Sequence, residues 1–217
     1  MTEAAEREMR EALVRAVKEK TAAIPLLTSQ TEAELFGERN QACFFTGHRD
    51  ILAPSGISSE QFQQQMRLWL EEQVESMIYR GFSTFLCGGA RGFDLLAAAA
   101  VLHAKPHHDA LRLILLLPCR EQTRGWSTRD LALHLAVLER AEAFYLQDTY
   151  DGACMQKRNR MLVDNAIAGI AYYDPEKVRS GTGMTVRYAQ MRGLPMVFMP
   201  LMSEDGSGHG CGEDDGV

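Results

Sequence analysis

Short apolar runs alternate with segments of helical periodicity from residue 41 to residue 199, and this alternation constrains the fold more than any other feature. The apolar runs cover residues 42–46, 82–86, 111–117, 143–146, 167–173 and 196–199, and the helical segments cover 62–78, 92–104, 128–142, 153–165 and 183–192. Strands that alternate with helices in this way form parallel sheets. Residues 111–117 are almost continuously apolar, as expected of a parallel strand that is covered on both faces. The sequence therefore predicts a single-domain α/β fold with a doubly wound, mainly parallel sheet flanked by helices.

The two ends of the chain differ from this central part, which spans residues 41–200. Residues 1–40 are predicted to be an N-terminal helical extension, because 2–20 carries a thin apolar stripe among charged side chains. This helix can dock on the domain, pair with a second copy in a homo-oligomer, or stay solvated, and the sequence leaves these alternatives open. Residues 201–217 are acidic and rich in glycine, which is typical of a disordered tail.

The charge of the chain is concentrated in that tail. The formal net charge is −6, but the tail holds five acidic residues and no Lys or Arg, so the rest of the chain is nearly neutral. A nearly neutral body lacks the basic surface that nonspecific nucleic-acid binding requires. Nucleic acid is therefore not expected as a partner.

The sequence also predicts the compartment. No apolar run approaches the roughly 18 residues of a membrane span, and charged residues from Glu3 onward leave no secretory signal in view. The five cysteines show neither CxxC nor Cys/His metal spacing, which predicts reduced thiols and no metal site. We therefore expect a cytoplasmic protein without a membrane contact, a metal or a cofactor.

A glycine-rich turn at 87–94 separates the apolar run 82–86 from an alanine-rich helical segment. A strand, a glycine turn and a helix start form a common anion site, because the backbone can approach closely and free N–H groups of the helix point at the ligand. A tight turn without a ligand is the alternative, but Arg91 and Asp94 flank the turn and favour a site. The candidate ligand-binding residues here are Gly88, Gly89, Ala90, Arg91 and Asp94.

Polar loops follow the other predicted strands as well. The candidate residues in these loops are Thr46, Gly47, His48 and Arg49 after the first strand, Pro118, Gln122 and Trp126 after the third, Arg158 and Asn159 after the fourth, and Ser180, Gly181 and Thr182 after the fifth. Ligands of doubly wound sheets bind beyond the carboxyl ends of the strands. The loop at 46–49 is equally explained as a surface turn, and an indole such as Trp126 more often packs than stacks on a ligand. Two glycine turns on one sheet favour a nucleotide-like small molecule with phosphate and sugar groups.

Several common motifs are absent from the sequence. There is no G-x-G-x-x-G after the first strand and no G-x-x-x-x-G-K-[ST], which excludes the usual dinucleotide fingerprint and a P-loop. There is no G-x-S-x-G, which argues against an α/β-hydrolase. Cys119 and Cys154 lie near the predicted site, and burial as small apolar side chains is favoured over a nucleophilic role.

Taken in order, five motifs of the chain resemble the YpsA/YoqJ-like branch of the SLOG superfamily, which is named for the DNA-processing protein DprA (Smf) and the Lonely Guy proteins. The motifs are F-F-T-G-H-R at 44–49, C-G-G-A-R-G-F-D at 87–94, P-C at 118–119 with Gln122 and Trp126, C-M at 154–155 with R-N-R-M at 158–161 and Asp164, and S-G-T at 180–182 with Thr185. The resemblance covers about residues 41–200. It implies a Rossmann-like fold without the dinucleotide fingerprint and a pocket for nucleotides or nucleotide-derived ligands. The branch itself has no settled biochemical activity.

The sequence departs from the family patterns at two positions. Ser180 stands where the family usually has a glycine, which implies a stiffer loop or one that uses the hydroxyl. Arg187 stands where Lonely Guy phosphoribohydrolases carry a catalytic glutamate, so this carboxylate is missing.

These observations favour a cytosolic binding or sensor protein for a nucleotide or nucleotide-derived ligand. The alternative is a hydrolase of a nucleotide N-glycosidic bond, with Asp94 or Asp164 as the general base. A further alternative is a DprA-like protein associated with single-stranded nucleic acid, which the neutral body disfavours. The sequence leaves open whether any reaction is catalysed.

Overall fold

Six parallel strands form one sheet in the computed structural model, which describes residues 2–36, 41–177 and 179–201. The strands are β1 (Ala42–Gly47), β2 (Thr84–Cys87), β3 (Arg112–Leu117), β4 (Glu142–Tyr145), β5 (Ala168–Tyr172) and β6 (Met196–Phe198). Their order is β4-β3-β2-β1-β5-β6, and every neighbouring pair is parallel. The chain builds the sheet outward from β1 to β4 and then returns to the other side of β1 with β5. The predicted doubly wound α/β fold is therefore confirmed, and the strand order reverses between β1 and β5.

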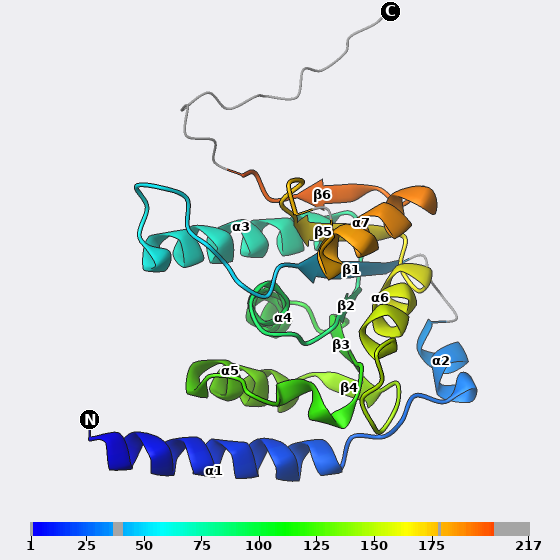
Figure 1. Cartoon of the computed structure of the whole chain (residues 1–217). Helices are drawn as coiled ribbons and strands as arrows, with labels where there is room; N and C mark the ends of the chain where they lie inside the picture. The colour runs from blue at the N-terminus through cyan, green and yellow to red at the C-terminus, as the bar shows by residue number, and fades with distance from the viewer. Residues whose placement is uncertain (1, 37–40, 178, 202–217) are drawn as a thin grey trace, which may run out of the picture.

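Helices cover both faces of this sheet. They are α1 (Glu3–Ala22), α2 (Ser29–Phe36), α3 (Ser59–Tyr79), α4 (Phe93–Ala104), α5 (Thr128–Leu138), α6 (Cys154–Asp164) and α7 (Gly181–Met191), with short 3-10 turns η2 (Lys105–His107) and η3 (Arg120–Thr123). Figure 1 shows α3, α4 and α5 on one face and α6 and α7 on the other. The predicted helix 183–192 starts earlier in the structure, because the Ser180 hydroxyl caps it. The short helix α2 was not predicted, since Pro25 and Gly37 bracket its segment.

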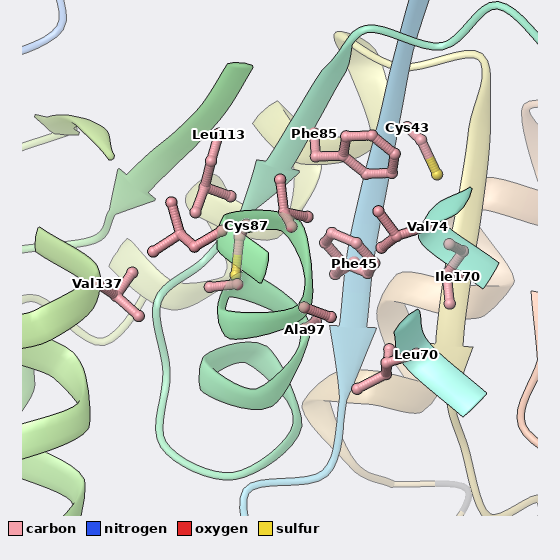
Figure 2. Packing of buried hydrophobic residues seen from close by; sticks show 14 of the residues in the cluster. Cys43, Phe45, Leu70, Val74, Phe85, Cys87, Ala97, Leu113, Val137 and Ile170 are labelled. Atoms are coloured by element: carbon pink, nitrogen blue, oxygen red, sulfur yellow. The ribbon is translucent and has the colours of Figure 1, made fainter. Parts of the chain in front are cut away.

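Successive strand residues point to opposite faces of the sheet and so form two hydrophobic cores. Phe45 and Phe85 stack with ring centroids 5.6 Å apart on the face that α3 and α4 cover. Figure 2 shows these two rings among side chains from β3, β5 and the helices. Phe44 and Leu86 point to the opposite face, where they pack against Leu162 and other residues of α6 and α7. Both faces are thus buried, as the continuous apolar run of β3 indicates.

The N-terminal segment packs on the domain. Val17 of α1 is buried in a cluster with Leu95, Trp126 and Leu131, and Figure 1 shows α1 alongside α5. The following segment pairs with the outer edge of β4, where the Tyr145 N–H donates to the Pro25 carbonyl at 2.9 Å and the Leu27 N–H to the Tyr145 carbonyl at 2.7 Å. Covering an exposed sheet edge removes a site for unwanted strand pairing.

The structure bears on two further predictions, the C-terminal tail and the absence of a membrane span. Of the predicted tail at 201–217, only Leu201 lies among the described residues. None of the helices in the described part of the chain combines the length and the apolar character needed to cross a membrane.

Candidate functional site

A cavity of about 390 Å³ opens beyond the carboxyl ends of β1 and β5, where the strand order reverses. We call it the switch-point pocket. It is lined by Phe45, Thr46, Gly47, His48, Arg49, Ala90, Asp94, Met155, Arg158, Asn159, Leu162, Ser180, Gly181 and Thr182. Eleven of these residues are predicted site residues, and they come from four segments that are far apart in the sequence. This edge of a doubly wound sheet is where such folds bind their ligands.

A buried ion pair forms the floor of the switch-point pocket. Arg158 of α6 and Asp94 of α4 are 6% and 7% exposed, and Arg158 Nη1 lies 3.4 Å from Asp94 Oδ2. Burial raises the pKa of Asp94, while the Arg158 guanidinium and the Ala90 N–H oppose this shift. Burial also lowers the pKa of Arg158, which the charge of Asp94 counteracts. Arg158 Nε is buried without a hydrogen-bond partner among the described residues, so one donor of this cation is unsatisfied.

The glycine turn leaves room for the Arg158 side chain, which packs against Gly88. A Cβ atom at Gly88 would overlap the Arg158 guanidinium, so the side chain fills the space that we predicted for a phosphate. Gly89 has φ +59°, and a Cβ there would lie 2.9 Å from Leu117. The Gln122 side-chain amide donates to the Gly89 carbonyl at 2.6 Å and fastens the turn. The lining of the switch-point pocket does not include Gly88, Gly89 or Gln122. Gly88 contributes indirectly, because it leaves room for Arg158.

The N-terminus of α4 is covered by the loop after β1. The Phe93 N–H donates to the His48 carbonyl at 3.2 Å. Gly92 has φ +81°, and a Cβ there would overlap the Arg49 carbonyl. A Cβ at Gly47 would likewise overlap the Phe93 ring, so both glycines allow the two loops to pack closely. The first free N–H group that we expected to bind an anion at this helix is therefore already occupied.

The N-terminus of α7 faces the pocket instead. The Ser180 hydroxyl accepts from the Gly183 N–H at 3.0 Å and caps the helix. The serine that stands where a glycine is usual therefore uses its hydroxyl, which is one of the two roles expected from the sequence. Gly181 and Thr182 line the pocket, and a Cβ at Gly181 would meet no described atom within 4 Å. The partial positive charge of a helix N-terminus favours anions.

The His48 side chain joins the loop after β1 to the loop after β5. Its Nε2 accepts from the Asp174 backbone N–H at 3.0 Å, so the proton of the neutral ring is assigned to Nδ1. Burial lowers the pKa of His48, and the nearby Lys177 lowers it further, which Asp174 partly opposes. A neutral imidazole at this position therefore holds the loop after β5 against the loop after β1. The sequence singled out His48 but gave no sign of its partner Asp174.

Asn159 is held on α6 by a chain of hydrogen bonds that reaches α7. Its Nδ2 donates to Thr185 Oγ1 at 2.7 Å, and the Thr185 hydroxyl donates to the Gly181 carbonyl at 2.9 Å. Met155 and Leu162 also line the pocket from α6, and sequence reasoning missed them as site residues. They lie three residues before and four residues after Arg158, so helical spacing from the predicted arginine was the available signal.

Several predicted residues lie outside the pocket lining. Arg91 donates to Asp50 in a surface ion pair at 2.7 Å. Trp126 is buried in the cluster below α1, with its ring 5.2 Å from His134, which matches the packing alternative. Pro118 is buried directly after β3. Asp164 accepts from the Tyr188 hydroxyl at 2.8 Å and pairs with Arg192, away from the pocket lining.

The charge of the switch-point pocket suits an anion. Arg49 and Arg158 supply two cations, the N-terminus of α7 adds partial positive charge, and Asp94 is the one carboxylate in the described lining. Arg49 is exposed, and its Nη2 lies 3.4 Å from Met155 Sδ. No group of three or more His, Cys, Asp or Glu side chains in the described part of the chain is arranged to hold a metal ion. The geometry can bind a phosphate or carboxylate group through charge-assisted hydrogen bonds.

Comparisons with known proteins agree on one family. The model of the YspA SLOG family matches residues 43–200. The UPF0398 protein of Bacillus pumilus is 21% identical over 159 residues, which are 72% of this chain and 86% of that protein. The SPbeta prophage-derived protein YoqJ of Bacillus subtilis is 30% identical over 119 residues, 49% of this chain and 68% of that protein. The UPF0398 protein YpsA of Bacillus subtilis is 24% identical over 138 residues, which are 61% of this chain and 77% of that protein.

Proposed function

The chain belongs to the YspA SLOG family, and we propose that it is a cytoplasmic binding or sensor protein for a nucleotide or nucleotide-derived ligand. The phosphate of that ligand enters the switch-point pocket and lies between Arg158, Arg49 and the N-terminus of α7. His48, Thr46 and Thr182 surround it with further polar groups.

The unsatisfied donor of Arg158 is the observation that carries this proposal. A buried guanidinium that lacks a partner for one N–H costs free energy, and native proteins keep such groups mainly where a ligand or water completes them. Arg158 is buried, pairs with Asp94 and packs closely against Gly88, so its guanidinium has a defined place in the absence of a ligand. Arginine is suited to phosphate because its planar fork can donate two parallel hydrogen bonds.

Titration calorimetry with AMP and inorganic phosphate tests the proposal. Arg49→Ala removes an exposed cation of the pocket, and Arg91→Ala removes a cation on the neighbouring loop that pairs with Asp50 outside the pocket lining. A charge-assisted hydrogen bond contributes about 1.5–3 kcal/mol, so Arg49→Ala is expected to weaken AMP binding by about 10- to 150-fold. Arg91→Ala is expected to leave the affinity unchanged. Absence of AMP binding to the wild type, or equal losses in both variants, would refute the proposal.

A hydrolytic function is the second candidate, and the position of Asp94 favours it. A buried carboxylate with a raised pKa in a ligand pocket is typical of a general acid or base. Its Oδ2 accepts from the Ala90 N–H at 3.3 Å as well as from Arg158. Release of free base from AMP by the wild type, lost in Asp94→Asn, would establish this function. The other carboxylate candidate, Asp164, lies outside the pocket lining.

A further inference from the structure

A second hollow lies beside the switch-point pocket, between α6 and α7. It has a volume of about 450 Å³ and is lined by Gly152, Met155, Gln156, Asn159, Arg160, Gly181, Met184, Thr185, Arg187, Tyr188 and Met191. We call it the α6–α7 groove, and Figure 1 shows the two helices that form it. Met155, Asn159 and Gly181 line both hollows, so the groove continues the pocket.

The junction between the two hollows is open at Gly181. A Cβ atom at this position would meet no described heavy atom within 4 Å, and the same holds for Gly152 at the groove. A linker between a phosphate in the pocket and a ring in the groove can therefore pass Gly181 without meeting a side chain. Because Met155, Asn159 and Gly181 line both hollows, the two hollows adjoin each other.

The groove is lined by apolar side chains that suit a flat ring. Met184 is 46% exposed and Met191 is 84% exposed, so α7 presents thioethers to solvent. Methionine adapts its shape to a ligand and makes favourable sulfur contacts with aromatic rings. Tyr188 adds an aromatic face, with the Arg160 guanidinium 5.8 Å from its ring centre. Exposed apolar hollows of this kind mark ligand or partner sites more often than ordinary surface.

Amide groups at the groove distinguish a heteroaromatic ring from an aliphatic chain. Gln156 and Asn159 line the groove, and Asn159 is fixed by its hydrogen bond to Thr185. Side-chain amides offer a donor and an acceptor that match the hydrogen-bonding edge of a nucleobase. An acyl chain offers no hydrogen-bonding group to the exposed Gln156 amide or to the Asn159 amide oxygen.

We propose that the α6–α7 groove holds the nucleobase of the ligand whose phosphate occupies the switch-point pocket. The inference rests on the proposed function and narrows its ligand to the mononucleotide class, with one sugar between phosphate and base. Met155 and Met184 contact the faces of the base, and Gln156 and Asn159 hydrogen-bond its edge.

Calorimetry on the full chain with AMP, ribose 5-phosphate and hexyl phosphate tests this assignment. AMP is expected to bind about tenfold more tightly than either of the other two, because only AMP carries a base for the thioethers and amides. Met184→Ala is expected to weaken AMP binding severalfold and to leave ribose 5-phosphate unchanged. Met9→Ala is the matched control, since Met9 is 41% exposed on α1, outside the groove lining.

The outcomes separate the two proposals. Equal affinities for AMP and ribose 5-phosphate would refute the base site and leave the phosphate pocket standing. Hexyl phosphate binding as tightly as AMP would assign the groove to an aliphatic group and refute a base. Failure of all three compounds to bind would overturn the proposed function and this inference with it.

Discussion

Replacing Arg158 with methionine is expected to destabilise the fold in a way that depends on pH. In the native protein Arg158 Nη1 lies 3.4 Å from Asp94 Oδ2, and both side chains are buried. Methionine keeps an unbranched chain in the space beside Gly88 but carries no charge. The Asp94 carboxylate is then left buried without its ion-pair partner, and among the described residues the Ala90 N–H remains as its hydrogen-bond donor.

The size of the effect follows from the two ways in which Asp94 can respond. Removing one partner of a buried ion pair costs about 3–5 kcal/mol. Asp94 limits this cost by taking up a proton, which for a carboxyl with an ordinary pKa of about 3.9 costs about 4 kcal/mol at pH 7 and about 1.5 kcal/mol at pH 5. Burial already raises the pKa of Asp94, and loss of the cation raises it further. The folded variant therefore binds a proton that the unfolded chain releases, and its stability relative to wild type increases as the pH falls.

Urea unfolding at pH 5, 6 and 7 measures this dependence. The loss of stability in Arg158→Met is expected to shrink from about 4 kcal/mol at pH 7 to about 1.5 kcal/mol at pH 5. In the double variant Arg158→Met/Asp94→Asn the titrating carboxyl is absent, so the loss is expected to be the same at each pH. A loss in Arg158→Met that does not change between pH 5 and pH 7 would refute the reasoning, because it would mean that Asp94 takes up no proton when the variant folds.

Two further predictions concern His134 and Trp126, whose rings are in contact where α1 packs on the domain. Burial lowers the pKa of His134 from 6.5 to about 4, so the unfolded chain binds a proton that the folded protein resists and stability is lost as the pH falls from 6.5 toward 4. Between pH 7 and pH 5 this loss of stability is about 2 kcal/mol. In urea unfolding, His134→Phe is expected to abolish the loss. An unchanged pH dependence in this variant would exclude His134 as its source. Trp126→Ala should cost about 3–5 kcal/mol of stability in the same assay, because the indole fills the cluster under α1. Its AMP affinity should equal that of wild type, and a clear loss would return Trp126 to the binding site.

The positions of most residues that line the switch-point pocket were predictable because parallel strands end at one edge of the sheet. Thr46–Arg49, Arg158 and Gly181 are far apart in the sequence, yet alternating strands and helices bring them to the same pocket. Arg91 and Trp126 were singled out by the same rule and lie outside the lining. A side chain in a strand-end loop can turn toward the ligand, toward solvent or toward the core, and the local sequence does not distinguish these directions.

The sequence alone determined the fold class of this protein, because hydrophobic periodicity and glycine turns act over neighbouring residues and decide where strands and helices form. Only the tertiary structure decided which backbone groups remain available to a ligand. The N-terminus of α4 has the glycine-rich sequence, but the His48 carbonyl takes its Phe93 N–H, and Arg158 fills the space at Gly88 from about 70 residues away in the chain. At the N-terminus of α7, by contrast, no side chain of the described residues lies within 4 Å of a Cβ atom placed at Gly181, so space for a ligand remains there. Occupancy of a donor or of a space depends on partners from distant segments, so it is established only when the chain has packed.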